Sequence, residues 1–332
     1  MPVGDVTAWP WGERTVLVTG GLGFIGSNLA LRLAELGARV RVVDALIPEM
    51  GGNRANLDRE DVHVAIGDVR DAGLIARLLE DVDTVFHLAG AVSHTRSMSE
   101  PLQDLELNCH ATLVLLEERR KQPRPSFLVY AGSRSQYGRT ESPMVDEAQP
   151  LRPVDVNGIH KSAAEALTTL YDGAHAQPSC SLRIGNTYGP RHQMRHAEQG
   201  FLHWFIRQAM DGETLRVFGG EQRRDFVFVD DVVNAMLAAA STADARAEAF
   251  NIASGTAISV LEVARLIIDV VGSGRVTVEA FPADRAAIEV GDFQADISKA
   301  GRLLGWTPRV ALREGLERTV AYYRPRRQLY WS

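Results

Sequence analysis

Short apolar runs and amphipathic stretches alternate along the first half of the chain. The apolar runs are rich in β-branched residues and occupy 15–20, 39–45, 62–69, 84–90, 126–133 and 179–189. Helical patterns lie between them, beginning at 25–37. Runs that are apolar on both faces and separated by helices are typical of a parallel sheet covered on its two sides. The pattern therefore predicts an α/β fold with a doubly wound parallel sheet.

The pattern changes after about residue 186. It predicts a short strand at 215–220, a strand running into a helix at 224–240, and further helices at 201–212, 258–272 and 312–324. We therefore expect one domain over residues 12–185, to which the chain returns around 224–254. The remainder of 186–325 is expected to form a smaller C-terminal α/β lobe.

Composition and charge argue against several classes of protein. The chain has 332 residues and a net charge of −6, whereas a general nucleic-acid binder is normally basic. Cys109 and Cys180 are far apart and lack CxxC spacing, which argues against a disulfide framework or a metal site and suits a reducing cytoplasm. No stretch reads as a signal peptide or a membrane span. We expect a cytoplasmic protein that needs no metal, nucleic acid or membrane.

A glycine-rich turn joins the first predicted strand to the first predicted helix. In "TGGLGFIG", Gly20, Gly23 and Gly26 permit a tight turn and a close approach of the backbone to a pyrophosphate. Phe24 and Ile25 open the helix, whose N-terminus offers N–H groups to an anion. The strand before the turn and the helix after it make this a dinucleotide-binding motif of a Rossmann-like domain.

Two further strand ends extend the predicted dinucleotide site. Asp44 ends the second strand, where a carboxylate accepts hydrogen bonds from ribose hydroxyls and repels a 2′-phosphate. Leu88 and Ala89, in "HLAG", end the fourth strand, where a small residue lets the cofactor lie close. The site is therefore predicted to bind NAD in preference to NADP.

The segment "GDVRD" at the end of the third strand has two interpretations. Asp68 and the N–H group of Val69 suit the edge of an adenine ring. Alternatively, Asp68 or Asp71 simply caps the following helix. The sequence leaves both interpretations open.

With these residues in place, the chain resembles the extended short-chain dehydrogenase/reductases, in particular the nucleotide-sugar epimerase/dehydratase family. The resemblance runs from about residue 13 to 324. Besides the segments above, it rests on "AGSRSQYG", Lys161, "LRIGNTYGPR", "RRDFVFVDD" and "ADISKAGRLLGWTP". It implies NAD as cofactor and a nucleotide-diphosphate sugar as substrate.

The resemblance also implies catalytic residues, with one departure. In the family a tyrosine, a lysine four residues later and a serine or threonine act together, and the tyrosinate takes a proton from a sugar hydroxyl while hydride passes to NAD. Ser133 and Lys161 match two of these places, whereas Asn157 stands in the place of the tyrosine. Asparagine does not titrate near neutrality, and positioned proton transfer is worth about 10²–10⁴-fold in rate.

Several groups could replace the missing tyrosine. Tyr137 is the first candidate, because the family carries a tyrosine there beside the sugar. His160 is adjacent to Lys161 but turned by about 100° on the helix, so we expect it to face elsewhere. His94, in the loop "AVSHTRS", and a water bound by Asn157 are further candidates.

On the substrate side, the resemblance implies contacts to the diphosphate. Asn186, Arg224 and Arg285 match residues that bind it in the family, and guanidinium groups suit two-pronged phosphate contact. The alternative for Arg224 is an ion pair with Asp225 or Asp230. The segment 191–201 is expected to lie over the sugar.

The family further implies a homodimer. Its members pair through the helix at 158–174, on which Ile159, Ala163, Leu167 and Leu170 form one stripe. The same stripe could instead face the sheet.

The function predicted from the sequence is that of an NAD-dependent nucleotide-sugar epimerase acting most simply at C4. The alternatives are a dehydrogenase or dehydratase of atypical mechanism, and a protein that binds NAD and the sugar with little catalysis because the tyrosine is missing. Arg134 and Ser135 occupy the places where the 4,6-dehydratases carry an acid pair, which argues against that subclass.

Overall fold

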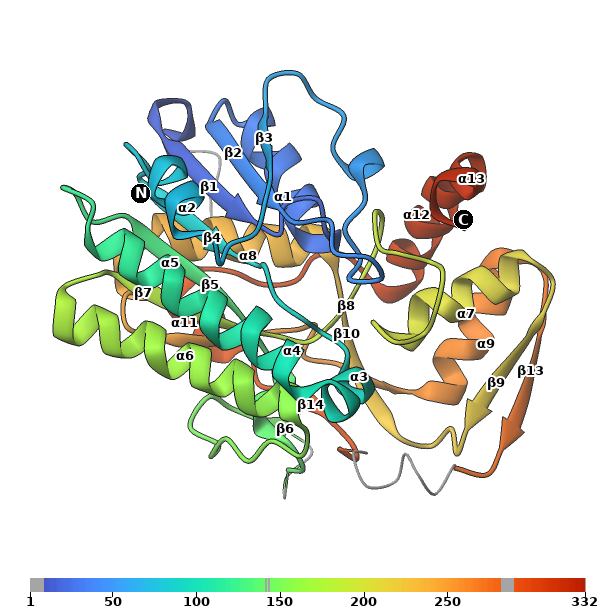
Figure 1. Ribbon diagram of the computed structural model, residues 1–332. Helices are drawn as coiled ribbons and strands as arrows, with labels where there is room; N and C mark the ends of the chain where they lie inside the picture. The colour runs from blue at the N-terminus through green and yellow to red at the C-terminus, as the bar shows by residue number, and fades with distance from the viewer. Residues whose placement is uncertain (1–8, 141, 143, 282–289, 332) are drawn as a thin grey trace.

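A seven-stranded parallel sheet forms the larger part of the computed structural model, which describes residues 9–140, 142, 144–281 and 290–331 (Figure 1). The strand order is β11-β7-β5-β4-β1-β2-β3, so the doubly wound fold predicted from the sequence is confirmed. The strands are β1 (Thr15–Thr19), β2 (Arg39–Asp44), β3 (His63–Ile66), β4 (Thr84–His87), β5 (Phe127–Ser133), β7 (Ser179–Ile184) and β11 (Ala249–Ile252). The chain order reverses between β1 and β4. Ligands of such sheets bind beyond the carboxyl ends of the strands at this point.

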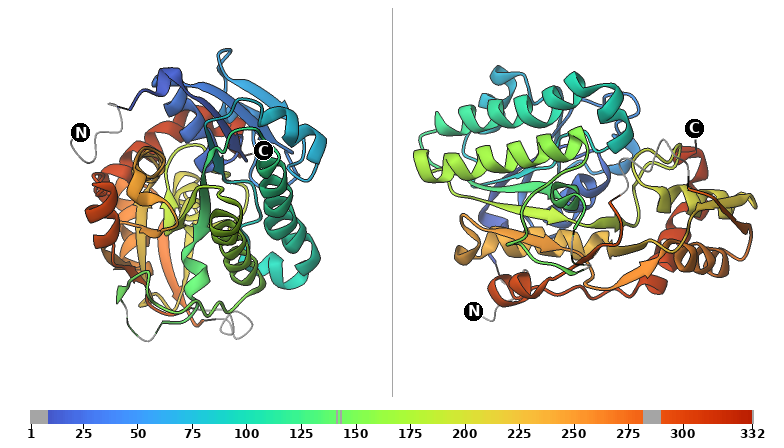
Figure 2. Two further views of the ribbon diagram at one scale, coloured as in Figure 1. Left: turned by 90° about the vertical axis from the view of Figure 1, so that its left-hand side faces the viewer. Right: turned by 90° about the horizontal axis from the view of Figure 1, so that it is seen from below.

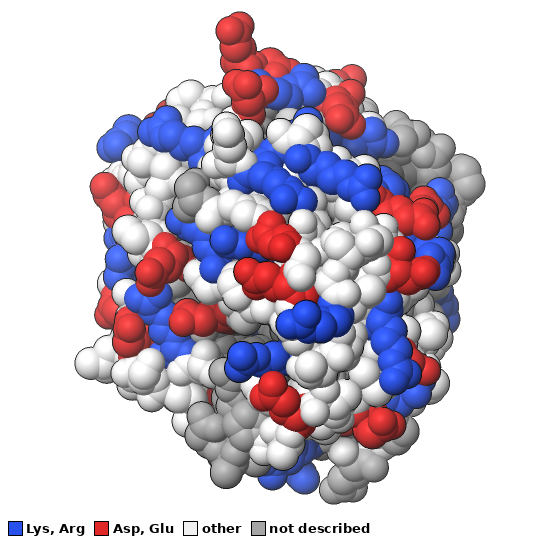
Figure 3. Space-filling model, turned by 90° about the vertical axis from the view of Figure 1, so that its right-hand side faces the viewer, with Lys and Arg blue, Asp and Glu red and all other residues white. Residues whose placement is uncertain are grey.

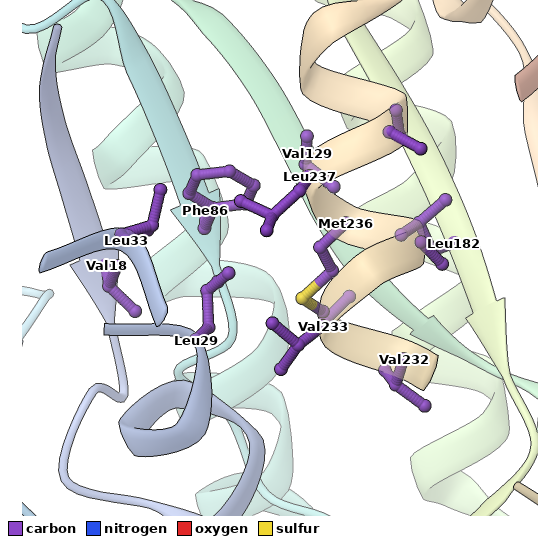
Figure 4. Packing of buried hydrophobic residues seen from close by; sticks show 14 of the residues in the cluster. Val18, Leu29, Leu33, Phe86, Val129, Leu182, Val232, Val233, Met236 and Leu237 are labelled. Carbon is purple, nitrogen blue, oxygen red and sulfur yellow. The ribbon is translucent and has the colours of Figure 1, made fainter. Parts of the chain in front are cut away.

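Helices cover both faces of this sheet (Figure 2). Those on one face are α1 (Phe24–Glu35), α8 (Val229–Ser241) and α11 (Ser298–Leu304); those on the other are α2 (Ala72–Leu78), α5 (Ala111–Arg120) and α6 (Val156–His175). Successive residues of β1 point to opposite faces. Val18 packs with α1 and α8 in the cluster of Figure 4, whereas Leu17 packs with α2 and α5. Burial on both faces explains why these strands are continuous apolar runs.

A smaller lobe has its own apolar core. Its strands are β8 (Asn186–Tyr188), β9 (Thr214–Phe218), β10 (Arg223–Phe228), β12 (Ala257–Ser259) and β13 (Arg275–Glu279). Its helices are α7 (Phe201–Met210), α9 (Val260–Val271), α12 (Leu312–Tyr323) and α13 (Arg327–Tyr330). Three further elements, α3 (His94–Ser99), α4 (Pro101–Leu105) and a π-helical turn (Glu106–His110), pack against α6, and β6 (Met144–Val145) pairs with β14 (Gln294–Ala295).

The apolar run at 179–189 is two strands rather than the single one predicted. It divides at Gly185 into β7, which belongs to the large sheet, and β8, which pairs with β10. A Cβ atom at Gly185 would lie 3.0 Å from the Cβ of Ala253, so the backbones approach closely at the division. The chain then returns to the large sheet through α8 and β11.

Candidate functional site

One cavity of about 850 Å³ lies between the carboxyl ends of the large sheet and the smaller lobe. Both lobes contribute to its wall. Its lining includes most of the residues expected to bind the cofactor or the diphosphate or to take part in catalysis: Gly20, Gly23, Phe24, Ile25, Gly26, Asp44, Asp68, Val69, Leu88, Ala89, Ser133, Asn157, Lys161, Asn186 and Arg224. Tyr137 is not among the lining residues, and Arg285 lies outside the described residues.

The glycine turn forms one end of the cavity. Gly20 has φ of +69°, which favours glycine, and α1 begins at Phe24 directly after the turn. A Cβ atom at Gly26 would lie 2.2 Å from the carbonyl oxygen of Gly20, so only glycine fits there. Bare backbone and a helix N-terminus thus face the same space, and this arrangement fits the pyrophosphate of a dinucleotide.

Asp44 is held beside this turn by backbone groups. Its Oδ2 accepts a hydrogen bond from Leu22 N at 3.0 Å, and its Oδ1 accepts one from Leu46 N at 2.8 Å. Burial raises the pKa of Asp44 against the opposing effect of these bonds. The carboxyl group therefore stands in a fixed position at the end of β2, which suits the two hydroxyls of a ribose.

In the structure, Asp68 and Asp71 of the "GDVRD" segment have different roles. Asp71 caps α2 by accepting a hydrogen bond from Leu74 N at 3.0 Å. Asp68 instead pairs with Arg70 through both oxygens, at 3.0 and 2.7 Å, and lines the cavity. The hydrogen bond from Arg70 lowers the pKa of Asp68. The cap thus belongs to Asp71, which leaves Asp68 beside the cofactor end of the cavity.

Lys161 lines the cavity and is almost fully buried. Its Nζ donates to the carbonyl oxygen of Ala131 at 3.3 Å and lies 5.5 Å from the ring centroid of Tyr130. Burial lowers the pKa of Lys161 to about 8, although the negative charge of Asp104 acts in the opposite direction. Lys161 is thus an amine whose proton is held less firmly than that of an exposed lysine.

Asn157 is bound to its surroundings through its amide group. Its Nδ2 donates to the carbonyl oxygen of Ala91 and to Oδ2 of Asp104, both at 2.9 Å. Asp104, itself buried, also accepts from Asn108 Nδ2 at 2.9 Å and lies 2.7 Å from His160 Nδ1. Asn157 therefore ties α6 to α4 and to the loop after β4 by supplying a donor to a buried carboxylate.

Asp104 has no motif around it and went unnoticed in the sequence. Its importance follows from burial together with three side-chain partners, two from α6 and one from the π-helical turn. His160 faces this carboxylate and does not line the cavity, as its position on the helix indicated.

Ser133 ends β5 and caps the short turn that follows. Its Oγ accepts hydrogen bonds from Ser135 N at 3.2 Å and from Ser135 Oγ at 2.9 Å. Its backbone N donates to Gln136 Oε1 at 2.7 Å. The hydroxyl group is thereby fixed at the cavity wall, on the strand next to the loop that carries Gly90.

The expectation that Tyr137 replaces the missing tyrosine is contradicted by its position. The phenol is buried away from the cavity, donates to Asn251 Oδ1 at 2.7 Å and accepts from Arg183 at 3.0 Å. Arg183 is in turn paired with Glu165. Burial raises the pKa of Tyr137 to about 12. Tyr137 therefore belongs to a closed polar network below the site and is not placed to move a proton in the cavity.

Polar groups from both lobes meet at the other end of the cavity. Asn186 Oδ1 accepts a hydrogen bond from Arg134 Nε at 2.7 Å, and both residues line the wall. Arg224 lines it as well and donates to the carbonyl oxygen of Gly291 at 2.6 Å. This cationic end suits a diphosphate. Arg134 thus lies at the site, whereas a solvated loop position was the interpretation that the sequence favoured.

Both carboxylates considered as ion-pair partners of Arg224 interact with other groups. Asp225 accepts from Ser254 and from the backbone of Gly255, and Asp230 pairs with Arg318.

Two histidines, His192 in the segment 191–200 and His203 on α7, lie at the boundary of the lobes. His192 stacks on His203 of α7, with ring centroids 3.8 Å apart and planes 3° apart, and Phe24 packs edge-on against both rings. Burial lowers the pKa of His192 to about 4 and that of His203 well below its ordinary value. These neutral rings pack α1 against the smaller lobe.

The surface carries charged side chains of both signs. Basic and acidic side chains are interspersed over the face of Figure 3. Within the described residues no cluster of His, Cys, Asp or Glu has the arrangement of a metal site, and none of the helices described there could cross a membrane. Cys109 and Cys180 are both free thiols.

Comparison with known proteins agrees with this geometry. The model of the NAD dependent epimerase/dehydratase family matches residues 16–253. The chain is 32% identical over 307 residues to a putative UDP-glucose 4-epimerase of Methanocaldococcus jannaschii, which covers 92% of this chain and 97% of that protein.

Two solved structures are similar over nearly the whole chain. The epimerase Mth375 of Methanothermobacter thermautotrophicus has a TM-score of 0.90 and 28% identity, covering 98% of this chain and 96% of that one. The UDP-glucose 4-epimerase of Thermotoga maritima, solved with UDP-glucose, has a TM-score of 0.86 and 32% identity, covering 94% and 99% respectively.

Proposed function

The chain belongs to the NAD dependent epimerase/dehydratase family, and we propose that within it the protein is a nucleotide-sugar 4-epimerase. The family and the NAD cofactor predicted from the sequence are confirmed. The finer proposal is that the enzyme holds NAD tightly while it oxidises the C4 hydroxyl of an NDP-hexose and reduces the ketone again. One observation carries it: a single cavity joins the glycine turn, Lys161 and the cationic end formed by Arg134 and Arg224.

The residues divide the work between the two ligands. When bound, NAD supplies a ring that accepts and returns hydride. The glycine turn and Asp44 would hold its pyrophosphate and ribose, and the ammonium group of Lys161 would donate hydrogen bonds to the second ribose. Asn186 and Arg224, from the smaller lobe, would hold the sugar diphosphate, with the sugar between them and Ser133.

The relatives support a UDP-hexose as substrate. The Thermotoga maritima structure contains UDP-glucose, and the Methanocaldococcus jannaschii protein is a putative UDP-glucose 4-epimerase. A 4,6-elimination needs a carboxylic acid to protonate the departing hydroxyl. Arg134 and the buried Ser135 stand where that acid pair would be, which favours epimerisation.

The test is product analysis with a panel of nucleotide sugars. Purified protein is incubated with UDP-glucose, UDP-N-acetylglucosamine and dTDP-glucose, and products are separated and identified by NMR while the NADH absorbance band is followed. We expect the C4 epimer to form with a low steady level of reduced cofactor. Bound sugar without product would instead support the binding protein, and a released ketone or uronic acid would support a dehydratase or a dehydrogenase.

We also propose that the protein is a cytoplasmic homodimer. Large apolar side chains are exposed on α4, α5 and α6, which pack against one another: Leu102, Leu105, Leu113, Ile159 and Leu170. Ala163 of the expected stripe is exposed too, whereas Leu167 packs partly against the core. Exposed apolar side chains on neighbouring helices suit burial against a second copy. Light scattering that gave the mass of one chain would contradict the dimer.

The proposed cytoplasmic location is supported by the two free thiols, which suit a reducing compartment.

A further inference from the structure

One histidine that lines the cavity belongs neither to the glycine turn nor to the diphosphate end. Three histidines line the cavity: His94, His192 and His203. The latter two are buried and stacked, and their ring nitrogens lie at backbone groups. His94 differs from them, because its side chain is 42% exposed and reaches the open space of the cavity.

A buried carboxylate orients the ring of His94. Its Nδ1 lies 2.9 Å from Oδ2 of Asp155, and Oδ1 of Asp155 accepts a hydrogen bond from Gly158 N at 2.7 Å. Asp155 is thereby fixed as the N-cap of α6. When Nδ1 carries the proton shared with Asp155, the lone pair of the ring is on Nε2. The pair then has the arrangement of an imidazole base held by a carboxylate.

The charge of Asp155 suits this role. Burial alone would raise its pKa, but the hydrogen bond and charge of His94 bring the pKa below its ordinary value. Asp155 therefore remains an anion that stabilises an imidazolium. Other charged groups around the pair are Arg134, near Asp155, and Arg96 on α3, which is paired with Glu49.

His94 and Asn157 are parts of one frame. The backbone N of Asn157 donates to Ser97 Oγ at 3.1 Å, and that hydroxyl donates to the carbonyl oxygen of His94 at 2.8 Å. Asp155 precedes Asn157 by two residues on the same helix end. The residue at the place of the tyrosine and the histidine beside the cavity are therefore fixed relative to each other through α3 and α6.

We propose that His94, oriented by Asp155, is the proton carrier of this enzyme. This inference rests on the proposed epimerase function. Nε2 accepts the proton of the sugar hydroxyl as the C–H bond at the same carbon gives up hydride to the bound cofactor and the C=O bond forms. The imidazolium returns its proton to that oxygen when hydride comes back to the carbon. Protons and electrons balance over the cycle, so no further reactant is needed.

The first test compares two histidine–carboxylate pairs. His94→Gln removes the titrating ring, and we expect turnover to fall by about 10²–10⁴-fold, with unchanged UDP-sugar affinity by calorimetry. The decline of kcat/KM toward acid pH, caused by protonation of the ring, should disappear. His110 lies 2.6 Å from Glu106 outside the cavity, so His110→Gln should leave rate and pH profile unchanged.

A second readout does not depend on turnover. Asp155→Asn keeps a residue type that caps helices but removes the anion, so an NMR titration should show the His94 ring losing its proton at lower pH than in the wild type. His94→Asn serves as a second variant if His94→Gln does not fold. If the wild type is active and His94→Gln is equally active, the role of His94 is overturned. An NMR titration of the ring that does not move in Asp155→Asn overturns it as well, and in both cases the epimerase proposal stands. A wild type that forms no product overturns the epimerase proposal and this inference with it.

Discussion

The glycine turn of the cavity and the region around Lys161, called the reaction end below, are built by different means. At the glycine turn the contacts come from backbone, the close approach of Gly20 to Gly26 and the start of α1, all within a few consecutive residues. At the reaction end the contacts come from side chains on α3, α4, β5 and α6, which are distant in the sequence. The glycine turn therefore has no room for an added atom. The reaction end depends on the chemistry of its side chains, so a different residue can take over a role if it offers the same chemistry.

The sharpest test of this difference is at the reaction end. Lys161→Met keeps the stem of the side chain and removes its amine, and we expect turnover to fall by at least about 10²-fold. Because burial lowers the pKa of Lys161 to about 8 and so disfavours its charge, the free energy of unfolding should not fall. Steady-state rates and thermal melts measure the two quantities.

Lys121→Met is the matched control for that change. Lys121 is an exposed lysine on the outside of the protein, 2.6 Å from Glu118. Its loss should change neither rate nor stability measurably. Equal turnover in both variants would remove Lys161 from the chemistry.

At the glycine turn a single methyl group should be harmful. Gly26→Ala places a Cβ atom 2.2 Å from the carbonyl oxygen of Gly20, and backbone must move to admit it. We expect a loss of about 1–3 kcal/mol in the free energy of unfolding and of most bound NAD, measured from the cofactor released on denaturation. Gly173→Ala, in open space on α6, should instead stabilise the protein slightly. Retention of NAD by Gly26→Ala would contradict the close approach.

The smallest effect is expected at the place of the missing tyrosine. Asn157→Leu has a similar volume but offers no donor to Asp104 or to the carbonyl oxygen of Ala91. We expect a loss of about 1–3 kcal/mol in stability, seen in chemical denaturation. Ser162→Ala removes a hydroxyl that donates back along α6, at 2.8 Å to the carbonyl oxygen of Gly158, and should change stability by less than about 0.5 kcal/mol. An unchanged midpoint for Asn157→Leu would show that the tie to Asp104 contributes little.

The same contrast explains what the sequence could predict. The alternation of apolar runs and helices is a local signal, so the sheet and the glycine turn were predicted correctly. Tyr137 was not, because its hydroxyl group meets Asn251 and Arg183, which are 114 and 46 residues away in the chain. Which way a side chain points off the end of a strand depends on such distant partners. Asp104 was missed for the same reason, and so was the division at Gly185, because the strand that pairs with β8 is β10, which follows much later in the chain.

The short connection at Gly185 has a consequence for how the enzyme opens. One residue separates β7 from β8, and α8 follows β10 without an intervening residue. These two passages of the chain between the lobes are thus regular structure rather than flexible linkers (Figure 1). We therefore expect the two lobes to keep nearly the same separation at these connections when a nucleotide sugar binds.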